Sequence, residues 1–179
     1  MFSSYYFFKI TGAVLTAVSS LMLGRKIRNQ LQLRRDILTA YKSGLEYSES
    51  KIVLDELVLE DCMKECSIRF LEKLPDYNIF SCFVDVLSDG KYTAEEAWTE
   101  SVKRVSLKGV LNDDDIQLLS ELSVTLGRAD IKHHSEHIKG VVSKLDNLIS
   151  EADLKLKKDG GLCIKLSVAV SAIIILLLW

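Results

Sequence analysis

The chain has 179 residues, 48% of them hydrophobic, and a formal net charge of −2 at pH 7. This length fits one domain of ordinary size, and a near-neutral charge with a pI near 5.9 argues against a general affinity for nucleic acid. The apolar residues are distributed unevenly, because long apolar runs lie at both ends of the chain.

The first apolar run covers residues 5–23, "YYFFKITGAVLTAVSSLML", and Lys9 is its only charge. A bilayer core needs roughly 20 apolar residues in a helix, so this run predicts a transmembrane helix. A cleavable signal peptide is the alternative, since "AVS" at 17–19 resembles a cleavage site. The positive residues follow the run as "RKIR" instead of preceding it, which favours an uncleaved anchor.

Residues 25–161 are expected to form one cytoplasmic domain, an all-α bundle of about six helices. Apolar residues spaced three, four and seven apart predict a long first helix, with a stripe made of Ile27, Leu31, Leu38, Tyr41 and Leu45. A second helix is predicted from near Ser50 to Pro75, which lacks a backbone donor and therefore ends it. A third helix should close at Gly90.

The fourth helix carries the clearest local signal. Thr93 and Glu96 have the spacing of a capping box, in which each side chain satisfies a backbone N–H of the other residue. A helix that begins there turns Ala97 and Trp98 toward the bundle. We therefore expect Trp98 to be a core residue.

Two more helices complete the predicted domain. The stretch "LNDDDIQLLSELSVTLG" predicts a helix capped by Asn112 or Asp113 and stopped by Gly127, with three acids at the positive end of its dipole. These acids are interpreted as capping groups rather than metal ligands. The last helix should begin near Asp130 and end before Gly160, where a Gly-Gly pair allows a hinge.

The second apolar run covers residues 162–179, "LCIKLSVAVSAIIILLLW", and Lys165 is its only charge. It predicts a C-terminal transmembrane helix. Basic residues flank both apolar runs on the domain side, namely Arg25, Lys26, Arg28, Arg34, Arg35, Lys155, Lys157 and Lys158. Because such residues stay on the cytoplasmic side, the domain is predicted in the cytoplasm, with both termini on the outer side of the membrane.

The stretch "IKHHSEHIKG" contains H-x-x-E-H at His133, Glu136 and His137, the zinc signature of one class of peptidases. The two histidines share a helix face, but a catalytic zinc also needs a third protein ligand from another element. The sequence after His137 offers only the same helix and the apolar run. We interpret the cluster as a solvated helix face and expect no metal and no cofactor.

Other chemical signatures are weak. Four cysteines (Cys62, Cys66, Cys82 and Cys163) suit a reducing compartment, where they act as small apolar residues; acylation of Cys163 stays open. The sequence has no G-x-S-x-G, no CxxC and no G-x-G-x-x-G, and "DGKYT" lacks the first glycine of a phosphate-binding loop. We therefore do not expect an enzyme.

Several stretches, taken in order, resemble the stage III sporulation protein AB family. They are "KITGAVLTAVSSLMLG", "AYKSGLEYSES", "TAEEAWTESV", "LNDDDIQLLSEL", "LGRADIKHH" and "GGLCIKLSVAVSAIIILLL". The likeness runs from Lys9 almost to the end of the chain, and "AEEAW" and "LG-x-x-D" are its most specific parts. Ala129 departs from the Ser expected in "LG-x-S-D", and "MFSSYY" lengthens the amino end.

The resemblance implies a membrane protein of endospore-forming bacteria, similar to a shortened platform protein of type II secretion or type IV pilus machines. It implies a place in the mother-cell (outer forespore) membrane, within the channel complex that joins mother cell and forespore. The implied partners are a companion motor ATPase and the other channel proteins, and a homo-oligomer is left open.

Two functions of other classes remain as alternatives. One is a membrane-anchored sensor or regulatory binding module, which would not co-purify with a motor ATPase. The other is a membrane enzyme that uses the histidine cluster, which would bind zinc stoichiometrically.

Overall fold

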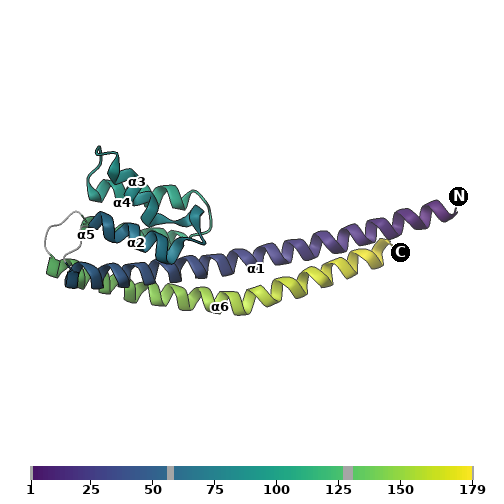
Figure 1. Ribbon diagram of the computed structural model, residues 1–179. Helices are drawn as coiled ribbons and strands as arrows, with labels where there is room; N and C mark the ends of the chain where they lie inside the picture. Colours follow the sequence, from purple (N-terminus) through teal and green to yellow (C-terminus); the bar gives the residue numbers. More distant parts are fainter. Residues whose placement is uncertain (1, 56–58, 127–130, 179) are drawn as a thin grey trace. The chain divides into compact units, whose positions relative to one another are not determined.

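The computed structural model describes residues 2–55, 59–126 and 131–178, with side chains for 11–51, 59–126, 135–163 and 165–176 (Figure 1). This part of the chain contains six α-helices and one short 3-10 helix and has no strand. The elements are α1 (Phe2–Asp55), α2 (Leu59–Leu71), the 3-10 helix (Pro75–Tyr77), α3 (Ile79–Ser88), α4 (Ala94–Ser106), α5 (Asp113–Leu126) and α6 (Ile131–Leu178). The predicted all-α class is confirmed.

The chain divides into two compact units. The helical hairpin consists of residues 1–33 and 151–179, and the helical bundle consists of residues 34–150. The two long helices, α1 and α6, each contribute one part to the hairpin and one part to the bundle.

Two predicted helix boundaries are wrong. The helix expected to begin near Ser50 does not, because α1 continues to Asp55 and α2 begins only at Leu59. The hinge expected at Gly160 and Gly161 is also absent, since α6 runs through both glycines. A glycine in a helix interior costs only about 1 kcal/mol relative to alanine. The good helix formers on both sides of Gly160 and Gly161 offset this cost, so the helix continues.

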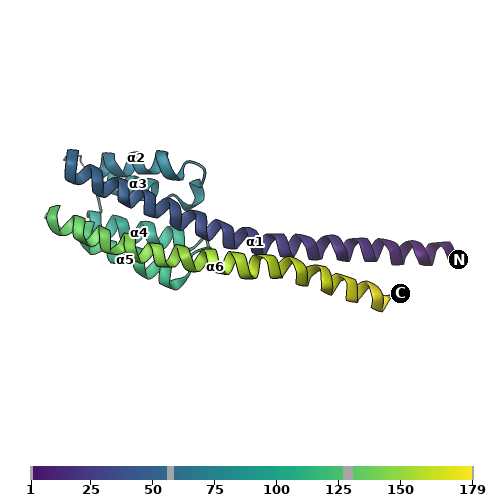
Figure 2. The same cartoon turned by 90° about the horizontal axis from the view of Figure 1, so that it is seen from below.

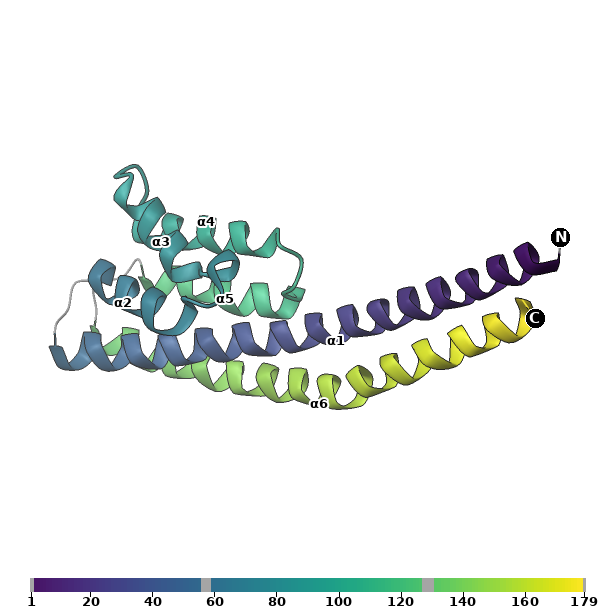
Figure 3. The ribbon, with the colours of Figure 1, turned by 45° about the vertical axis from the view of Figure 1, so that its right-hand side comes forward.

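The bundle has a continuous apolar core. From α1, the predicted stripe is completely or almost completely buried at Leu38, Tyr41 and Leu45, whereas Ile27 lies in the hairpin and is 37% exposed. The shorter helices α2, α3, α4 and α5 pack each against the next (Figures 2 and 3). They supply the other large buried side chains, among them Met63, Leu71, Ile79, Phe80, Phe83, Trp98, Leu119 and Leu122.

The turns of the bundle follow local chemistry. Pro75 opens the 3-10 helix, where its missing N–H costs nothing. The Tyr41 hydroxyl donates to the Tyr77 carbonyl at 2.6 Å, and burial raises the pKa of this phenol. Gly90 and Gly109 have φ angles of 67° and 70°, a left-handed conformation that favours glycine after the helices they follow.

Candidate functional site

The hairpin packs its two helices through small residues. The Ser20 hydroxyl of α1 donates to the Ser167 carbonyl of α6 at 2.6 Å. A Cβ atom added to Gly24 would lie 2.7 Å from the Ser167 Oγ and 3.3 Å from the Cys163 carbonyl oxygen. Small side chains let the two backbones approach closely, which is how helices associate in membranes. The two helices run antiparallel here, so both termini lie at the same end of the hairpin (Figure 1).

The outer faces of the hairpin are apolar. Of the 19 large hydrophobic side chains exposed in the described part of the chain, 15 lie in the hairpin. They are Val14, Leu15, Val18, Leu21, Met22, Leu23, Ile27, Leu154, Leu162, Leu166, Val168, Val170, Ile173, Ile174 and Leu176. Meanwhile Gly24 and Ser171 are buried. The hairpin therefore buries Gly24 and Ser171 between its helices and exposes large apolar side chains on its outer faces.

One helical stretch within the described residues, Ser135–Leu176, is long and apolar enough to cross a bilayer. Only 12% of its most apolar window is buried, whereas a core helix of a soluble protein would be mostly buried. Length, composition and exposure are thus all compatible with membrane association.

The hairpin and the bundle carry net charges of opposite sign. The hairpin has eight Lys and Arg residues against three Asp and Glu, a net charge of +5. The bundle has fifteen against twenty-two, a net charge of −7. The near-neutral total thus conceals a cationic unit and an anionic unit.

The residues of the fourth predicted helix are placed together at the start of α4. The Thr93 hydroxyl accepts from the Glu96 N–H at 3.3 Å, and the Glu96 carboxylate accepts from the Thr93 N–H at 2.9 Å. The second bond, from the Thr93 backbone, lowers the pKa of Glu96. Ala97 and Trp98 are completely buried, and the Trp98 Nε1–H donates to the Leu119 carbonyl at 2.7 Å. This group is a structural site that fixes α4 in the bundle.

A buried ion pair at the start of α5 was missed by the sequence analysis. The Arg34 guanidinium donates to both oxygens of Asp115, at 2.8 and 2.9 Å, and the Asp115 side chain has no exposed surface. The same carboxylate accepts the Asn112 N–H at 2.9 Å. Asp115 therefore satisfies a backbone N–H at the start of its own helix, a role that the sequence analysis had given to the side chain of Asn112 or Asp113, and it also holds α1. The partner is 81 positions away, and no local pattern shows it.

The histidine cluster is only partly described. His137 is exposed, and its Nδ1 lies 2.7 Å from the Thr125 hydroxyl, which occupies one of the two nitrogens that could bind a metal. The side chain of His133, and residues Gly127 and Asp130, lie outside what the structure describes. Glu136 is exposed. Across the described side chains, no group of three or more His, Cys, Asp or Glu residues could hold a metal ion.

The two cysteines of α2 are buried structural groups. The Cys66 thiol donates to the Gly44 carbonyl at 3.3 Å, and the Cys62 thiol points to the Ser48 carbonyl at 4.0 Å. The hydrogen bond with Cys62 and burial both raise the pKa of Cys66. A thiol held protonated is a poor nucleophile, and the Cys66 thiol instead links α2 to the Gly44 carbonyl of α1.

The fold and these sites define the class: an all-α protein with a compact, anionic helical bundle and a cationic helical hairpin whose outer surface is apolar. The family model described as stage III sporulation protein AB matches residues 9–179. The chain belongs to that family, which is not a known family of enzymes, and membership implies a role in sporulation.

Individual relatives agree with this assignment. The chain is 24% identical over 170 residues to stage III sporulation protein AB of Bacillus subtilis (strain 168), covering 95% of this chain and 98% of that protein. A solved structure of stage III sporulation protein AB (SpoIIIAB) superposes with a TM-score of 0.62 at 22% identity. It covers 69% of this chain and 96% of that one. At this identity, the superposition shows a shared fold.

Proposed function

We propose that this chain is a non-enzymatic membrane platform of the sporulation channel complex between mother cell and forespore. Its hairpin anchors it in the bilayer, and its bundle presents surfaces to partner proteins. The observation that supports the anchor is the exposure of 15 large hydrophobic side chains on a hairpin that buries Gly24 and Ser171. In water, that arrangement would be unfavourable, because removing apolar surface from contact with water lowers the free energy. Contact with lipid tails would remove the same surface from water.

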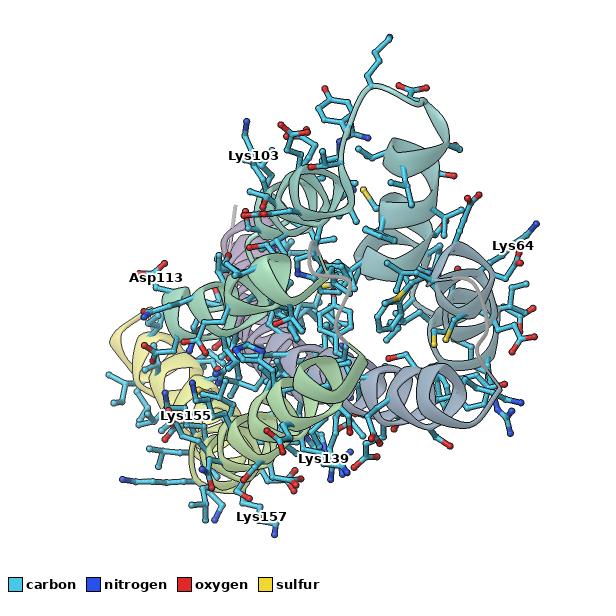
Figure 4. The ribbon with its side chains drawn as sticks, turned by 90° about the vertical axis from the view of Figure 1, so that its left-hand side faces the viewer. Lys64, Lys103, Asp113, Lys139, Lys155 and Lys157 are labelled. Atoms are coloured by element: carbon cyan, nitrogen blue, oxygen red, sulfur yellow. The ribbon has the colours of Figure 1, made fainter. Side chains whose placement is uncertain are left out.

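The proposed topology places the bundle in the cytoplasm of the mother cell and both termini on the outer side of its membrane. It is supported by the exposed basic residues at the bundle side of the hairpin. The natural thiols Cys62 and Cys66 are completely buried and are poor reporters of topology. A cysteine at Lys64, which is exposed on α2 (Figure 4), is a better one.

The topology experiment uses Lys64→Cys and Ser4→Cys, each in a chain whose Cys82 and Cys163 are replaced by Ser. In intact cells that express the chain without sporulating, so that it lies in the plasma membrane, a membrane-impermeant maleimide should label position 4 and leave position 64 unlabelled until the membrane is opened. Labelling of position 64 in intact cells would reverse the proposed orientation.

The bundle is the proposed docking unit for the companion ATPase and for other channel proteins. A net charge of −7 favours partner surfaces that are basic, since complementary charge steers association. One candidate surface is a groove of about 500 Å³ between α1 and the carboxyl end of α2, lined by Asp36, Thr39, Ala40, Ser43, Arg69, Phe70, Glu72, Lys73 and Leu74.

A photo-crosslinking map in sporulating cells tests the docking role. A photoreactive amino acid is placed at Lys64, Lys73, Lys103 or Asp113, which are exposed on different elements of the bundle (Figure 4 labels three of them). Leu15 of the hairpin serves as the matched control position. Capture of the motor ATPase from one bundle face, and not from position 15, is expected. Normal spore formation with no ATPase captured at any bundle position would favour a regulatory module instead.

A further inference from the structure

Basic residues of the hairpin are concentrated in two short runs. Arg25, Lys26 and Arg28 belong to α1, and Lys155, Lys157 and Lys158 belong to α6. All six side chains are exposed, and Figure 4 shows Lys157 projecting away from its helix. We call these six residues the basic collar.

The two runs lie close to each other along the axis of the hairpin. A Cβ added to Gly160 would contact the Cγ of Arg28 at 3.4 Å, so the aliphatic stem of Arg28 lies against α6 there. Gly24 faces Cys163 and Ser167 in the same way. Residues 24–28 of α1 are thus opposite residues 160–167 of α6. At about 1.5 Å per residue, Gly160 lies about 3 Å beyond Lys158 and about 8 Å beyond Lys155 along the helix.

The collar borders the apolar surface on both helices. On α1, the exposed side chains of Leu21, Met22 and Leu23 are separated from Arg25 by Gly24 alone. On α6, the exposed Leu162 and Leu166 follow Lys158 by four and eight residues. A band of positive charge therefore lies at one end of the exposed apolar surface of the hairpin. Juxtamembrane basic residues next to a membrane-spanning helix have the same arrangement, with the charges at the level of the lipid headgroups.

Acidic residues reduce the charge of the collar without cancelling it. Glu151 accepts from Lys155 at 2.6 Å, in a pair whose two side chains are each 46% exposed. Asp153 and Asp159 lie in the same part of α6. Six basic and three acidic residues leave this band with a net charge of +3.

We propose that the basic collar binds the phosphate groups of anionic phospholipids in the leaflet next to the bundle. Guanidinium groups form paired hydrogen bonds to phosphate, and ammonium groups act as point charges beside it. Lysine stems lie along the apolar surface while their charges reach the headgroups. The anionic bundle, at a net −7, is repelled by the same leaflet, so the collar counteracts that repulsion.

The inference rests on the proposed membrane anchoring, and one experiment separates the two. The full chain is reconstituted into vesicles of phosphatidylcholine alone and of phosphatidylcholine with phosphatidylglycerol, and resistance to alkaline extraction is measured. Retention in both kinds of vesicle supports anchoring. Extraction from both overturns the anchoring, and with it the collar proposal.

Lipid preference is then measured by titrating the detergent-solubilised full chain with phosphatidylglycerol or phosphatidylcholine and counting bound lipids by native mass spectrometry. The wild type should bind phosphatidylglycerol more tightly. Replacing Lys155, Lys157 and Lys158 by Gln should weaken that binding roughly a hundredfold, at about fivefold per cation removed. These substitutions keep good helix formers at exposed positions, so folding should be unaffected.

The matched control replaces Lys64, Lys73 and Lys103 of the bundle by Gln, an equal change in charge at exposed positions. It should bind phosphatidylglycerol like the wild type. Equal weakening in both triple variants, or none in the collar variant, would overturn the proposal. Competition by inorganic phosphate at the concentration of the lipid would show a site for soluble anions, which also overturns a lipid surface as the occupant.

Discussion

In the bundle, Tyr41, Phe80 and Trp98 have no exposed surface, whereas in the hairpin Leu15 and Met22 are each 67% exposed. The same α1 helix contributes to both units, and its residues change from exposed apolar side chains to buried ones along its length. Burial of large apolar groups stabilises a fold in water. The contrast teaches that one continuous helix can bury its large apolar side chains in one unit and expose them in the other, so the two parts call for separate tests.

The largest expected effect comes from emptying the core of the bundle. Trp98→Ala should lower the free energy of unfolding by about 3–5 kcal/mol, as is typical for a buried aromatic residue. It removes contacts with Phe80 and Phe83, whose ring centroids lie 6.2 and 5.8 Å away, and the bond to Leu119. The measurement is denaturant unfolding of the full chain in detergent, followed by exposure of the buried Cys66 thiol.

Trp98→Phe is the control for this prediction, since it keeps most of the ring volume and loses only the N–H donor. It should fall between wild type and Trp98→Ala. Unchanged unfolding of Trp98→Ala together with lost partner binding would mean that Trp98 contacts a partner.

The buried ion pair should give the next effect. Asp115→Ala leaves Arg34 charged and almost enclosed, at 5% exposure, and should cost about 3 kcal/mol, the lower end of the range for breaking a buried pair. Replacing both residues at once, by Arg34→Met with Asp115→Leu, should recover most of this loss. About 1 kcal/mol should remain, because the cap on the Asn112 N–H is still missing. If the double variant were less stable than Asp115→Ala, the pair would have a role beyond charge compensation.

In the hairpin, the sensitive positions are small residues. Gly24→Leu should separate the two helices, because its side chain would overlap Ser167; overpacking of this kind costs about 1–3 kcal/mol. Disulfide formation between Ser20→Cys and Ser167→Cys, whose native groups are hydrogen-bonded, reports the helix contact. Gly12→Leu is the matched control, since nothing lies within 4 Å of its added Cβ. Equal crosslinking in both variants would show that close packing at Gly24 is not required.

The smallest effect is expected at the histidine cluster. Replacing His133 and His137 together by Gln should change stability by no more than about 0.5 kcal/mol. His137 is exposed, His133 is expected on the same solvated helix face, and surface substitutions seldom have larger effects. At position 137, a glutamine amide can keep the bond to Thr125. Spore yield should stay near that of the wild type. A collapse in yield, with the protein abundant and folded, would restore the case for chemistry at this site.

Local signals allowed accurate prediction where a helix is set by its own residues. Helix α4 begins at Ala94, directly after Thr93, because both bonds of the box between Thr93 and Glu96 form within four residues. The end of α1 was predicted too early, near Ser50, whereas the helix continues to Asp55. The Ser48 hydroxyl bonds to the Leu45 carbonyl of its own helix, so the polar stretch around it continues the helix instead of starting another.

Contacts between distant residues could not be predicted. The pairing of Arg34 with Asp115, and the approach of Gly24 to Ser167, each join helices far apart in the sequence. A single sequence shows the charge and the small side chain but not the partner. The apolar runs, in contrast, depend on composition alone. They predicted a membrane-spanning helix at each end of the chain, and the described residues contain one helical stretch, Ser135–Leu176, that is long and apolar enough for this.

The most direct test of the account is labelling of the full chain, in membranes of sporulating cells, with a photoreactive reagent that partitions into lipid. Mass spectrometry then identifies the labelled residues. We predict labels on exposed hairpin side chains such as Leu15, Val170 and Ile173, with exposed bundle residues such as Ile68 and Leu107 unlabelled. Labels spread equally over both units, or absent from the hairpin, would contradict the claim that the hairpin is the membrane anchor.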